Sequence, residues 1–366
     1  MLSRNLGGTF KMNSRERVNS AISHRRPDRT PKGDLAVEPK LEKALAAAGG
    51  FSGDNPQHRR LAALRYLNAD IAHVHEYPVM ALGKDAKERL VYRGAFGEEF
   101  ASGEYGHVLV KPALADPSGA FDYVAPGPDI ATTGKLDFFR RESDLFVSAQ
   151  IGGPISQLDW TLGMEDMMMW CLTDEAAMVV FARKMIEFEI GRACLFLDHG
   201  ADLILVADDI AFNSGSFLPP ASMEKLAWPF YREMISRIKA HRDVPVFLHT
   251  DGDIRVMMEK IVECGFDGLQ SLQPSAGVDI QEIKRQYGRK LCLWGNLDLD
   301  RLMPFGTPVE ISDEVHRLCR DIGYDGGFIL STCNILIDAI PLENVLAMYS
   351  SGDECGCCGN VGGLQK

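Results

Sequence analysis

The chain has 366 residues, of which 46% are hydrophobic and 25% are charged, and this balance excludes wholesale disorder. Its net charge of −12 argues against binding to a phosphate backbone, so we expect no nucleic-acid partner. No apolar run reaches the roughly 18–20 residues that span a bilayer, and no secretory signal opens the chain. We therefore expect a cytoplasmic protein without a membrane partner, in which the nine cysteines stay reduced.

The first predicted element is a helix that begins after Asn13. Asn13 can cap the helix while Glu16, three residues on, reaches back to the cap in a capping box. Pro27 and Pro31 end this unit, because the residue before a proline is disfavoured in helical conformation. Residues 1–11 precede it and are predicted to form a disordered extension.

From there the chain alternates short apolar runs with helical patterns. The runs predicted as strands are residues 33–38, 70–76, 146–151, 203–207, 244–249, 268–272, 291–294 and 327–331. Helical spacing between them is clearest over residues 174–196, 223–241, 255–264, 280–287 and 311–322. Such alternation implies a parallel sheet, and eight units in this length favour a (β/α)₈ TIM barrel over an open sheet. The sequence therefore predicts one α/β domain over residues 12–350.

Two segments depart from this alternation. Residues 77–145 are rich in glycine, proline and polar side chains, and they predict an inserted loop or an antiparallel segment after the second strand. Residues 351–366 form a tail rich in cysteine and glycine, with Cys355, Cys357 and Cys358 close together. This cluster is either a soft-metal site or a frayed terminus with incidental thiols.

Barrel enzymes carry their catalytic groups at the carboxyl ends of the strands, so the predicted strands also predict the site. The residues expected there to act in catalysis are His75, Glu76 and Asp208, and those expected to contact substrate are Gln150, Asp209, Gln270, Trp294 and Asn296. Ordinary alternatives remain for several of them. The His75–Glu76 pair is either an acid–base unit or a half-buried hydrogen-bonded pair. The Asp208–Asp209 pair either binds a ligand or caps a loop. Trp294 either contacts substrate or packs against other side chains at the open end of the barrel.

Three further residues have the chemistry of metal ligands. His249 and Asp251 are two residues apart at a strand end, so both side chains can point to the same face. With the thiolate of Cys333 they would form a three-ligand zinc site with an open fourth position, as catalytic zinc uses. The alternatives are a substrate-binding histidine, a loop-capping carboxylate and a buried thiol. Phosphate-loop, dinucleotide, nucleophile-elbow and cobalamin motifs are absent from the sequence.

At these residues the sequence resembles the uroporphyrinogen decarboxylase superfamily, from about residue 12 to residue 350. The resemblance is carried by the segments NSRERVNSAISHRRPDRTP, VPVFLHTDGDI, LQSLQPSAGVDIQEIKRQYG, LCLWGNLDLD and GGFILSTCNILIDAIPLENVLAMY. The superfamily contains porphyrinogen decarboxylases and zinc-dependent methyltransferases that act with corrinoid proteins. Its fold is a (β/α)₈ barrel, which agrees with the strand count.

The resemblance favours the methyltransferase branch. Decarboxylases carry an arginine-rich loop near the first strand, whereas PKGDLAVE stands there in this chain. The methyltransferases hold zinc with His-x-Cys after strand five and a cysteine after strand eight. His249 and Cys333 match these places, while Asp251 replaces the first cysteine, which calls a thiol acceptor into question.

The leading hypothesis is therefore a zinc-dependent methyltransferase of a corrinoid-linked demethylation system. The corrinoid would be supplied by a partner protein, and the methyl donor or acceptor would be a small molecule. The alternatives are a decarboxylase of the uroporphyrinogen type and a non-catalytic corrinoid or tetrapyrrole carrier. A homo-oligomer is compatible with each of these hypotheses.

Overall fold

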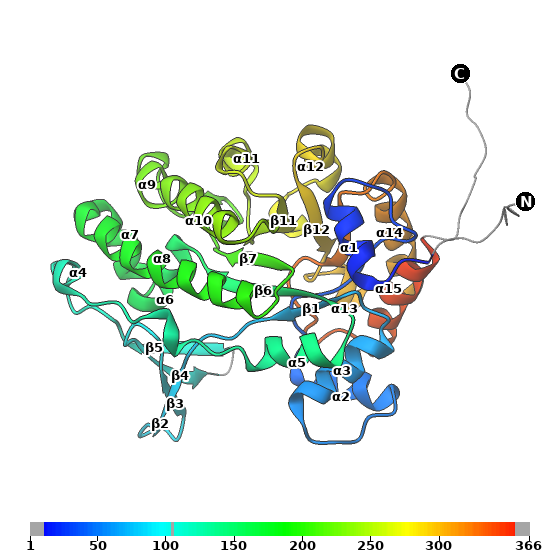
Figure 1. Ribbon diagram of the computed structural model, residues 1–366, viewed down its shortest axis with the longest axis horizontal. Helices are drawn as coiled ribbons and strands as arrows, with labels where there is room; N and C mark the ends of the chain where they lie inside the picture. Colours follow the sequence, from blue (N-terminus) through cyan, green and yellow to red (C-terminus); the bar gives the residue numbers. More distant parts are fainter. Residues whose placement is uncertain (1–10, 104–105, 356–366) are drawn as a thin grey trace, which may run out of the picture.

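The computed structural model describes residues 11–103 and 106–355 of the chain (Figure 1). Its centre is a parallel sheet of seven strands in the order β1-β6-β7-β10-β11-β12-β13. These strands are β1 (Ile71–Val74), β6 (Phe146–Gly152), β7 (Leu203–Ala207), β10 (Val246–Thr250), β11 (Gly268–Ser271), β12 (Cys292–Leu297) and β13 (Phe328–Thr332). The sequence located each of these seven strands to within two or three residues, and the α/β architecture is confirmed.

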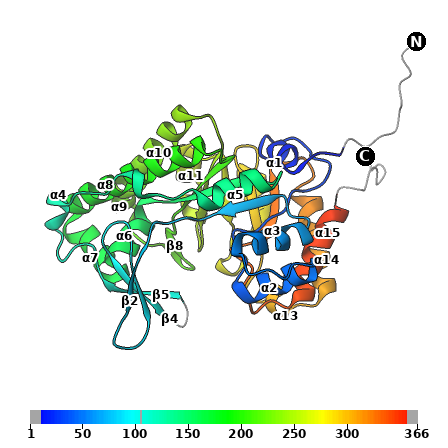
Figure 2. The ribbon, with the colours of Figure 1, turned by 60° about the horizontal axis from the view of Figure 1, so that its bottom comes forward.

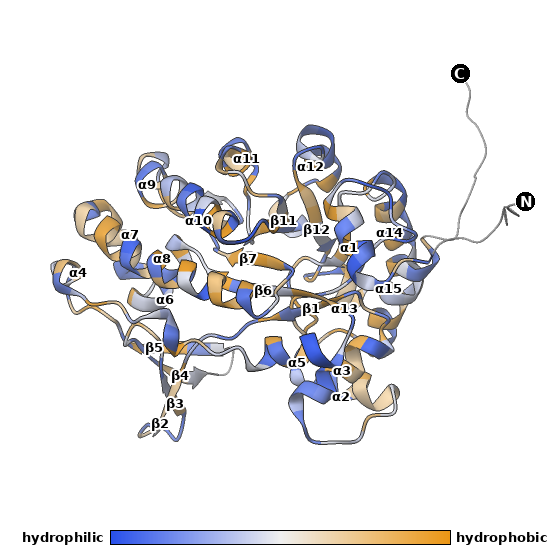
Figure 3. Cartoon of the chain, viewed as in Figure 1, coloured by the Kyte–Doolittle hydropathy of each residue, from blue (hydrophilic) through white to orange (hydrophobic). Residues whose placement is uncertain are grey.

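Both faces of the sheet are buried, which explains why its strands read as unbroken apolar runs. In β7, Leu203 and Leu205 pack in one apolar cluster with Trp294, while Ile204 and Val206 belong to a second, larger cluster. The alternation follows from the two-residue period of a strand. Figure 3 shows apolar colour along β7 and a mixture of apolar and hydrophilic colour along the helices that surround it.

Helices surround the sheet (Figure 1). They are α1 (Ser14–Ile22), α2 (Pro39–Ala48), α3 (Pro56–Tyr66), α4 (Gly119–Asp122), α5 (Gly134–Glu142), α6 (Pro154–Leu162), α7 (Met164–Thr173), α8 (Glu175–Asp198), α9 (Pro220–Leu226), α10 (Trp228–His241), α11 (Met258–Cys264), α12 (Ile280–Tyr287), α13 (Leu302–Phe305), α14 (Pro308–Asp321) and α15 (Leu342–Glu354). Short 3₁₀ helices cover Pro128–Ile130, Arg255–Met257 and Pro274–Ala276. The helix predicted over 223–241 is in fact α9 and α10, separated at Ala227.

The first predicted strand, residues 33–38, is not a regular strand. The chain there makes isolated parallel bridges, Lys32 to Leu330 and Val37 to Leu336, and the N–H of Asp70 donates to the carbonyl of Lys32 at 2.8 Å. It therefore runs between β13 and β1 without a continuous ladder. One reason is local: the Asp34 carboxylate, instead of a backbone carbonyl, accepts from the N–H of Thr332 at 2.8 Å. Closure into a complete eight-stranded barrel stays a prediction.

The segment that the sequence set apart, residues 77–145, contains a four-stranded antiparallel sheet. Its strands are β2 (Met80–Lys84), β3 (Leu90–Arg93), β4 (Glu99–Gly103) and β5 (Gly106–Lys111). Figure 2 shows this sheet projecting from the body of the molecule beside α6. A second small hairpin, β8 (Ala211–Phe212) and β9 (Gly215–Ser216), follows β7.

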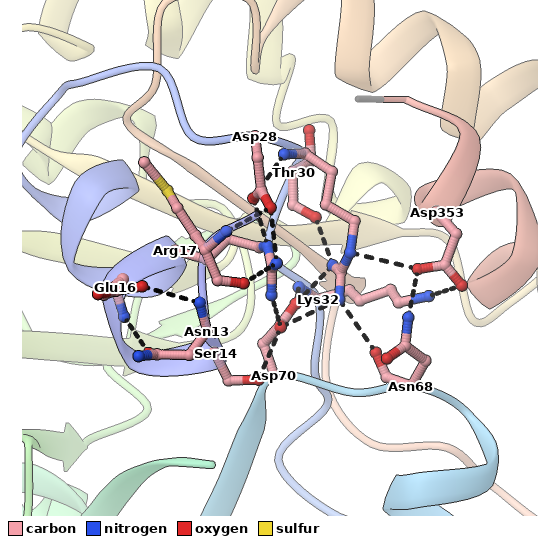
Figure 4. Close-up of polar contacts among 12 residues, drawn as sticks. Asn13, Ser14, Glu16, Arg17, Asp28, Thr30, Lys32, Asn68, Asp70 and Asp353 are labelled. Carbon is pink, nitrogen blue, oxygen red and sulfur yellow. Dashed lines mark hydrogen bonds and ion pairs between the residues drawn. The ribbon is translucent and has the colours of Figure 1, made fainter. Parts of the chain in front are cut away.

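Helix α1 is anchored at the end of the parallel sheet where the strands begin. Its predicted capping box is confirmed, since Asn13 and Glu16 each accept from the other's backbone N–H at 2.9 Å. From this helix Arg17 reaches Asp70, the residue just before β1, at 2.6 Å, and Arg29 binds the same carboxylate at 2.6 Å. Lys32 extends the network to Asp353 at 2.8 Å (Figure 4).

The structure describes only part of the predicted tail. Helix α15 continues to Glu354, so residues 351–354 belong to that helix, and Cys355 follows it. Cys357, Cys358 and nearly all of the predicted extension over residues 1–11 lie outside the described residues. Among the helices that the structure describes, none combines the length and the apolar composition needed to cross a bilayer.

Candidate active site

A cavity of about 630 Å³ lies where the parallel strands end. The antiparallel sheet forms one wall with Tyr92, Phe100 and His107, and the parallel strands supply polar groups that include His73 and His249. The remaining lining residues are Leu35, Ala36, His75, Tyr77, Val79, Gln150, Gly152, Ser156, Gln157, Trp160, Arg192, Ala207, Asp209, Asn334 and Ile335. The cavity is thus formed jointly by the inserted antiparallel sheet and by the ends of the parallel strands.

Three potential metal ligands converge at the edge of this cavity, which Asp209 and His249 line, while Asp251 lines an adjoining pocket. Asp209 follows β7, His249 lies in β10 and Asp251 follows β10, and one ligand atom of each lies within 4.8 Å of the others. The chain can turn sharply after Asp251 because the next residue is Gly252, whose φ of +86° is a left-handed conformation that favours glycine. A side chain at that position would also collide with the carbonyl of Ala211.

The hydrogen bonds of His249 prepare its other nitrogen for a cation. Its Nδ1 contacts the amide oxygen of Gln270, whose Nε2 donates to the carbonyl of Cys333 at 3.4 Å. Nδ1 therefore carries a hydrogen, so that in the neutral tautomer Nε2 is the nitrogen that can bind a metal ion. That Nε2 lies 3.9 Å from a carboxylate oxygen of Asp209. An imidazole nitrogen and a carboxylate oxygen at this separation can both contact one metal ion.

The two carboxylates are also held in place. Asp251 accepts from the hydroxyl of Ser271 and from Nδ2 of Asn334, the latter at 2.7 Å. Its own N–H donates to Asp209 at 2.9 Å. Such supporting bonds orient the ligands of metal centres in proteins.

The donor set therefore fits a divalent metal ion. One imidazole nitrogen and two carboxylate oxygens are ligands that Zn²⁺ accepts, and they are harder than a thiolate set. Among the described residues, the thiol of Cys333 is not part of this group of donor atoms. Burial and the charge of Asp251 raise the pKa of Cys333 to about 12, so the thiol stays protonated at neutral pH. The structure thus joins His249 and Asp251 to Asp209, where the sequence had predicted Cys333.

Asp208, predicted to be catalytic, is turned away from the cavity. Its carboxylate accepts from the N–H groups of Ile155 and Ser156 at the start of α6 and from the hydroxyl of Tyr231. Burial raises its pKa to about 7. Asp208 therefore positions α6, and of the Asp208–Asp209 pair only Asp209 faces the cavity.

His75 and Glu76 do not form an acid–base pair, because consecutive residues of an extended chain point to opposite faces. His75 lines the cavity with an exposed side chain, and partial desolvation there together with the charges of Arg192 and Lys135 lowers its pKa. Glu76 is buried, accepts from the N–H of Lys135 at 2.9 Å at the start of α5, and has a pKa raised by burial. Glu76 is thus placed to fix α5, and His75 remains a neutral group of the cavity wall.

The predicted substrate contacts divide in the same way. Gln150 and Asp209 line the cavity, with Gln150 bound to Nε2 of His73 at 3.0 Å. Gln270 lies behind His249. Trp294 is fully buried in the interior of the sheet and donates to the carbonyl of Gly33 at 2.8 Å, so it packs the core. Asn296 is also buried and donates to the carbonyl of Leu272 at 3.0 Å.

Sequence reasoning missed His73 and the aromatic wall. His73 could have been found, because it lies two residues before His75 and therefore shares its strand face. It is buried, its Nδ1 bonds to Ser148 at 2.9 Å, and burial lowers its pKa to about 3. Tyr92 and Phe100 gave no such signal, because only the folded position of the inserted sheet brings them to the cavity.

Many enzymes share an α/β fold with a polar cavity at the strand ends. Comparison with known proteins identifies the family to which this chain belongs. The family described as uroporphyrinogen decarboxylase (URO-D) matches residues 135–354. The chain therefore belongs to the uroporphyrinogen decarboxylase family, and the resemblance inferred from its motifs is confirmed.

Relatives of known activity include both methyltransferases and decarboxylases. The chain is 25% identical over 216 residues to the methylated-thiol–coenzyme M methyltransferase of Methanosarcina mazei, covering 58% of this chain and 55% of that protein. It is 23% identical over 229 residues to the methylcobamide:CoM methyltransferase MtaA of Methanosarcina barkeri, covering 62% and 59%. It is 30% identical over 131 residues to the uroporphyrinogen decarboxylase of Chlorobium luteolum, covering 36% and 34%.

These matches span between about a third and three fifths of the relatives' own lengths. Among solved structures, a methyltransferase from Methanosarcina mazei superposes with a TM-score of 0.73 at 18% identity, covering 94% of this chain and 99% of that one. This likeness shows that the two proteins share a fold.

Proposed function

We propose that this protein is a metal-dependent methyltransferase that moves a methyl group between a small molecule and a corrinoid carried by a partner protein. The observation that carries the proposal is the convergence of Asp209, His249 and Asp251 beside the cavity, which the first two of them line. The two methyltransferase relatives support it, since both are named for methyl transfer to coenzyme M and one for a methylcobamide. The partner is invoked because the sequence lacks a cobalamin-binding motif.

Zn²⁺ bound by Asp209, His249 and Asp251 would act as a Lewis acid toward the sulfur or oxygen atom that gains or loses the methyl group. The chain's own residues prepare the site. Gln270 holds the hydrogen on Nδ1 of His249, so that Nε2 is free to bind. The aromatic wall would cover the apolar part of a substrate, and Gln150, held in place by His73, would contact its polar part.

Charge argues against decarboxylation of a porphyrinogen. A substrate with eight carboxylates needs a cationic cavity, yet Arg192 is the one permanent cation among the described lining residues. Arg192 is already bound to the buried carboxylate of Glu189 at 2.6 Å. The cavity also contains Asp209, whose charge would repel such a substrate.

The proposal is tested by metal analysis of the wild type and of ligand variants. We expect one zinc ion per chain, lost in His249→Ala and weakened in Asp209→Ala and Asp251→Ala, because each removes one of three ligands. Cys333→Ser is the matched control and should keep its metal. Asp251→Cys should keep zinc but reduce its Lewis acidity, because thiolates donate more electron density than carboxylates.

Activity completes this test. Methyl transfer between cobalamin and thiol or methoxy compounds is followed by the cobalamin absorbance, and coproporphyrinogen formation is assayed in parallel. A wild type without zinc, with methyl transfer unchanged in His249→Ala, would refute the proposal. Formation of coproporphyrinogen would replace it with decarboxylation.

A further inference from the structure

The cavity contains a second polar site, formed by Gln157 of α6 and Arg192 of α8 (the α6–α8 subsite). Both residues line the cavity, and their exposed fractions are only 6% and 1%. Oε1 of Gln157 and Nε of Arg192 are buried without a hydrogen-bond partner. An unpaired buried acceptor and an unpaired buried donor each cost stability, which points to a ligand that satisfies them.

The other polar atoms of Gln157 and Arg192 already have hydrogen-bond partners, chiefly the buried carboxylate of Glu189. Glu189 accepts from Nε2 of Gln157 at 3.0 Å and from Arg192 at 2.6 Å. Arg192 also donates to the carbonyl of Glu76 at 2.6 Å. The charges of Glu189 and Arg192 cancel, so the subsite offers one donor and one acceptor but no net charge for an anion.

The aromatic wall of the cavity, Tyr92 and Phe100, is extended by Tyr77 and Trp160. Phe100 and Trp160 meet edge to face, with ring centroids 5.3 Å apart, and the guanidinium of Arg192 lies 5.5 Å from the ring of Tyr77. Such surfaces favour a flat apolar body. In the metal-free protein Asp209 adds negative charge to the same cavity and disfavours an anionic ligand further.

We propose that the cavity binds an uncharged, flat methyl compound that carries one hydroxyl group, and that the α6–α8 subsite holds this hydroxyl. The hydroxyl donates to Oε1 of Gln157 and accepts from Nε–H of Arg192, while the aromatic wall covers the apolar body. The methyl-bearing end then faces Asp209 and His249. This inference rests on the proposed function for the methyl group, but the binding itself requires no metal.

The test uses three probes of similar shape: 4-methoxyphenol, 4-methoxytoluene and 4-methoxybenzenesulfonate. Calorimetry on the full chain, with and without chelator, should show the phenol binding about three- to tenfold more tightly than the toluene, the range expected of a hydrogen bond. In the presence of chelator the sulfonate should bind at least about tenfold more weakly than the phenol, because its charge then has no counter-ion in the cavity.

Variants locate the effect. Gln157→Leu should abolish the preference for the phenol over the toluene, whereas Gln286→Leu, an exposed glutamine of α12, should keep it. Trp160→Ala should weaken the phenol and the toluene equally, and its side chain is 49% exposed, so folding should be preserved.

Equal binding of phenol and toluene by the wild type would overturn the inference, since water alone would then satisfy the subsite. Sulfonate binding as tight as phenol binding in the presence of chelator would also overturn it, and so would an unchanged preference in folded Gln157→Leu. The wild-type ranking decides the matter if that variant does not fold. Failure of methyl transfer with the ranking intact would count against the proposed function alone.

Discussion

The two ends of the parallel sheet hold their carboxylates in different ways. At the amino end, Asp70 is fully buried and enclosed by Arg17 and Arg29, each 2.6 Å away. At the carboxyl end, Asp209 and Asp251 lie close to His249. Among the described residues, neither carboxylate forms an ion pair with an arginine or a lysine. The first cluster pairs its carboxylate with arginines of the same chain, whereas the second presents an imidazole and two carboxylates that we propose to bind a metal ion.

A further buried carboxyl group shows another solution. Glu98, just before β4, accepts from the hydroxyl of Tyr77 and the N–H of Phe96, each at 3.0 Å, and forms none of the ion pairs found among the described residues. Burial raises its pKa to about 7. A carboxyl group in this fold is thus neutralised by arginine, by a proton or, as proposed, by a metal ion.

The largest effect should come from breaking the arginine-paired network. Asp70→Ala leaves Arg17 buried with one partner fewer, and the loss of one member of a buried ion pair costs about 3–5 kcal/mol of unfolding free energy. Urea denaturation measures it. The matched control is Glu282→Ala, which removes an exposed ion pair with Arg285 and should change stability little. Equal effects in the two variants would show that the network is not structural.

A smaller effect, dependent on pH, should come from the protonated carboxyl. The pKa of Glu98 is about 7 in the folded protein, against an ordinary value of 4.5. Between these values the folded state binds more protons than the unfolded state, so stability falls as pH rises through that window, by at most about 3 kcal/mol. Glu98→Gln should flatten this fall in denaturation curves recorded from pH 4.5 to 7.5. A slope identical to that of the wild type would exclude Glu98 as its source.

The smallest effect should come from the support behind His249. Gln270→Leu removes the acceptor that holds the hydrogen on Nδ1, and loss of such a supporting bond lowers metal affinity about 10- to 100-fold. Competition with a chromogenic chelator measures the affinity. Gln150→Leu is the matched control, because Gln150 bonds to a histidine of the same cavity, His73, that is outside the cluster. Comparable losses in both variants would contradict the assigned role of Gln270.

The sequence by itself determined where along the chain the chemistry lies. Apolar runs located β7, β10 and β13, because strands buried on both faces read as continuous hydrophobic segments. The polar residues after those runs then had to lie at one edge of the sheet, and this reasoning alone placed Asp209, His249 and Asp251 near one another. The Asn13–Glu16 cap was equally readable, because its hydrogen bonds span only three residues.

The tertiary structure alone decided which of these residues meet. Asp208 and Asp209 are adjacent in sequence, yet one caps α6 and the other faces the cavity, because the start of α6 supplies the N–H groups that Asp208 accepts. Cys333 matches the position of a ligand but is absent from the group of donor atoms that the fold assembles. The α6–α8 subsite was equally hidden, since Gln157 and Arg192 lie 35 residues apart and meet only through the packing of two helices around Glu189.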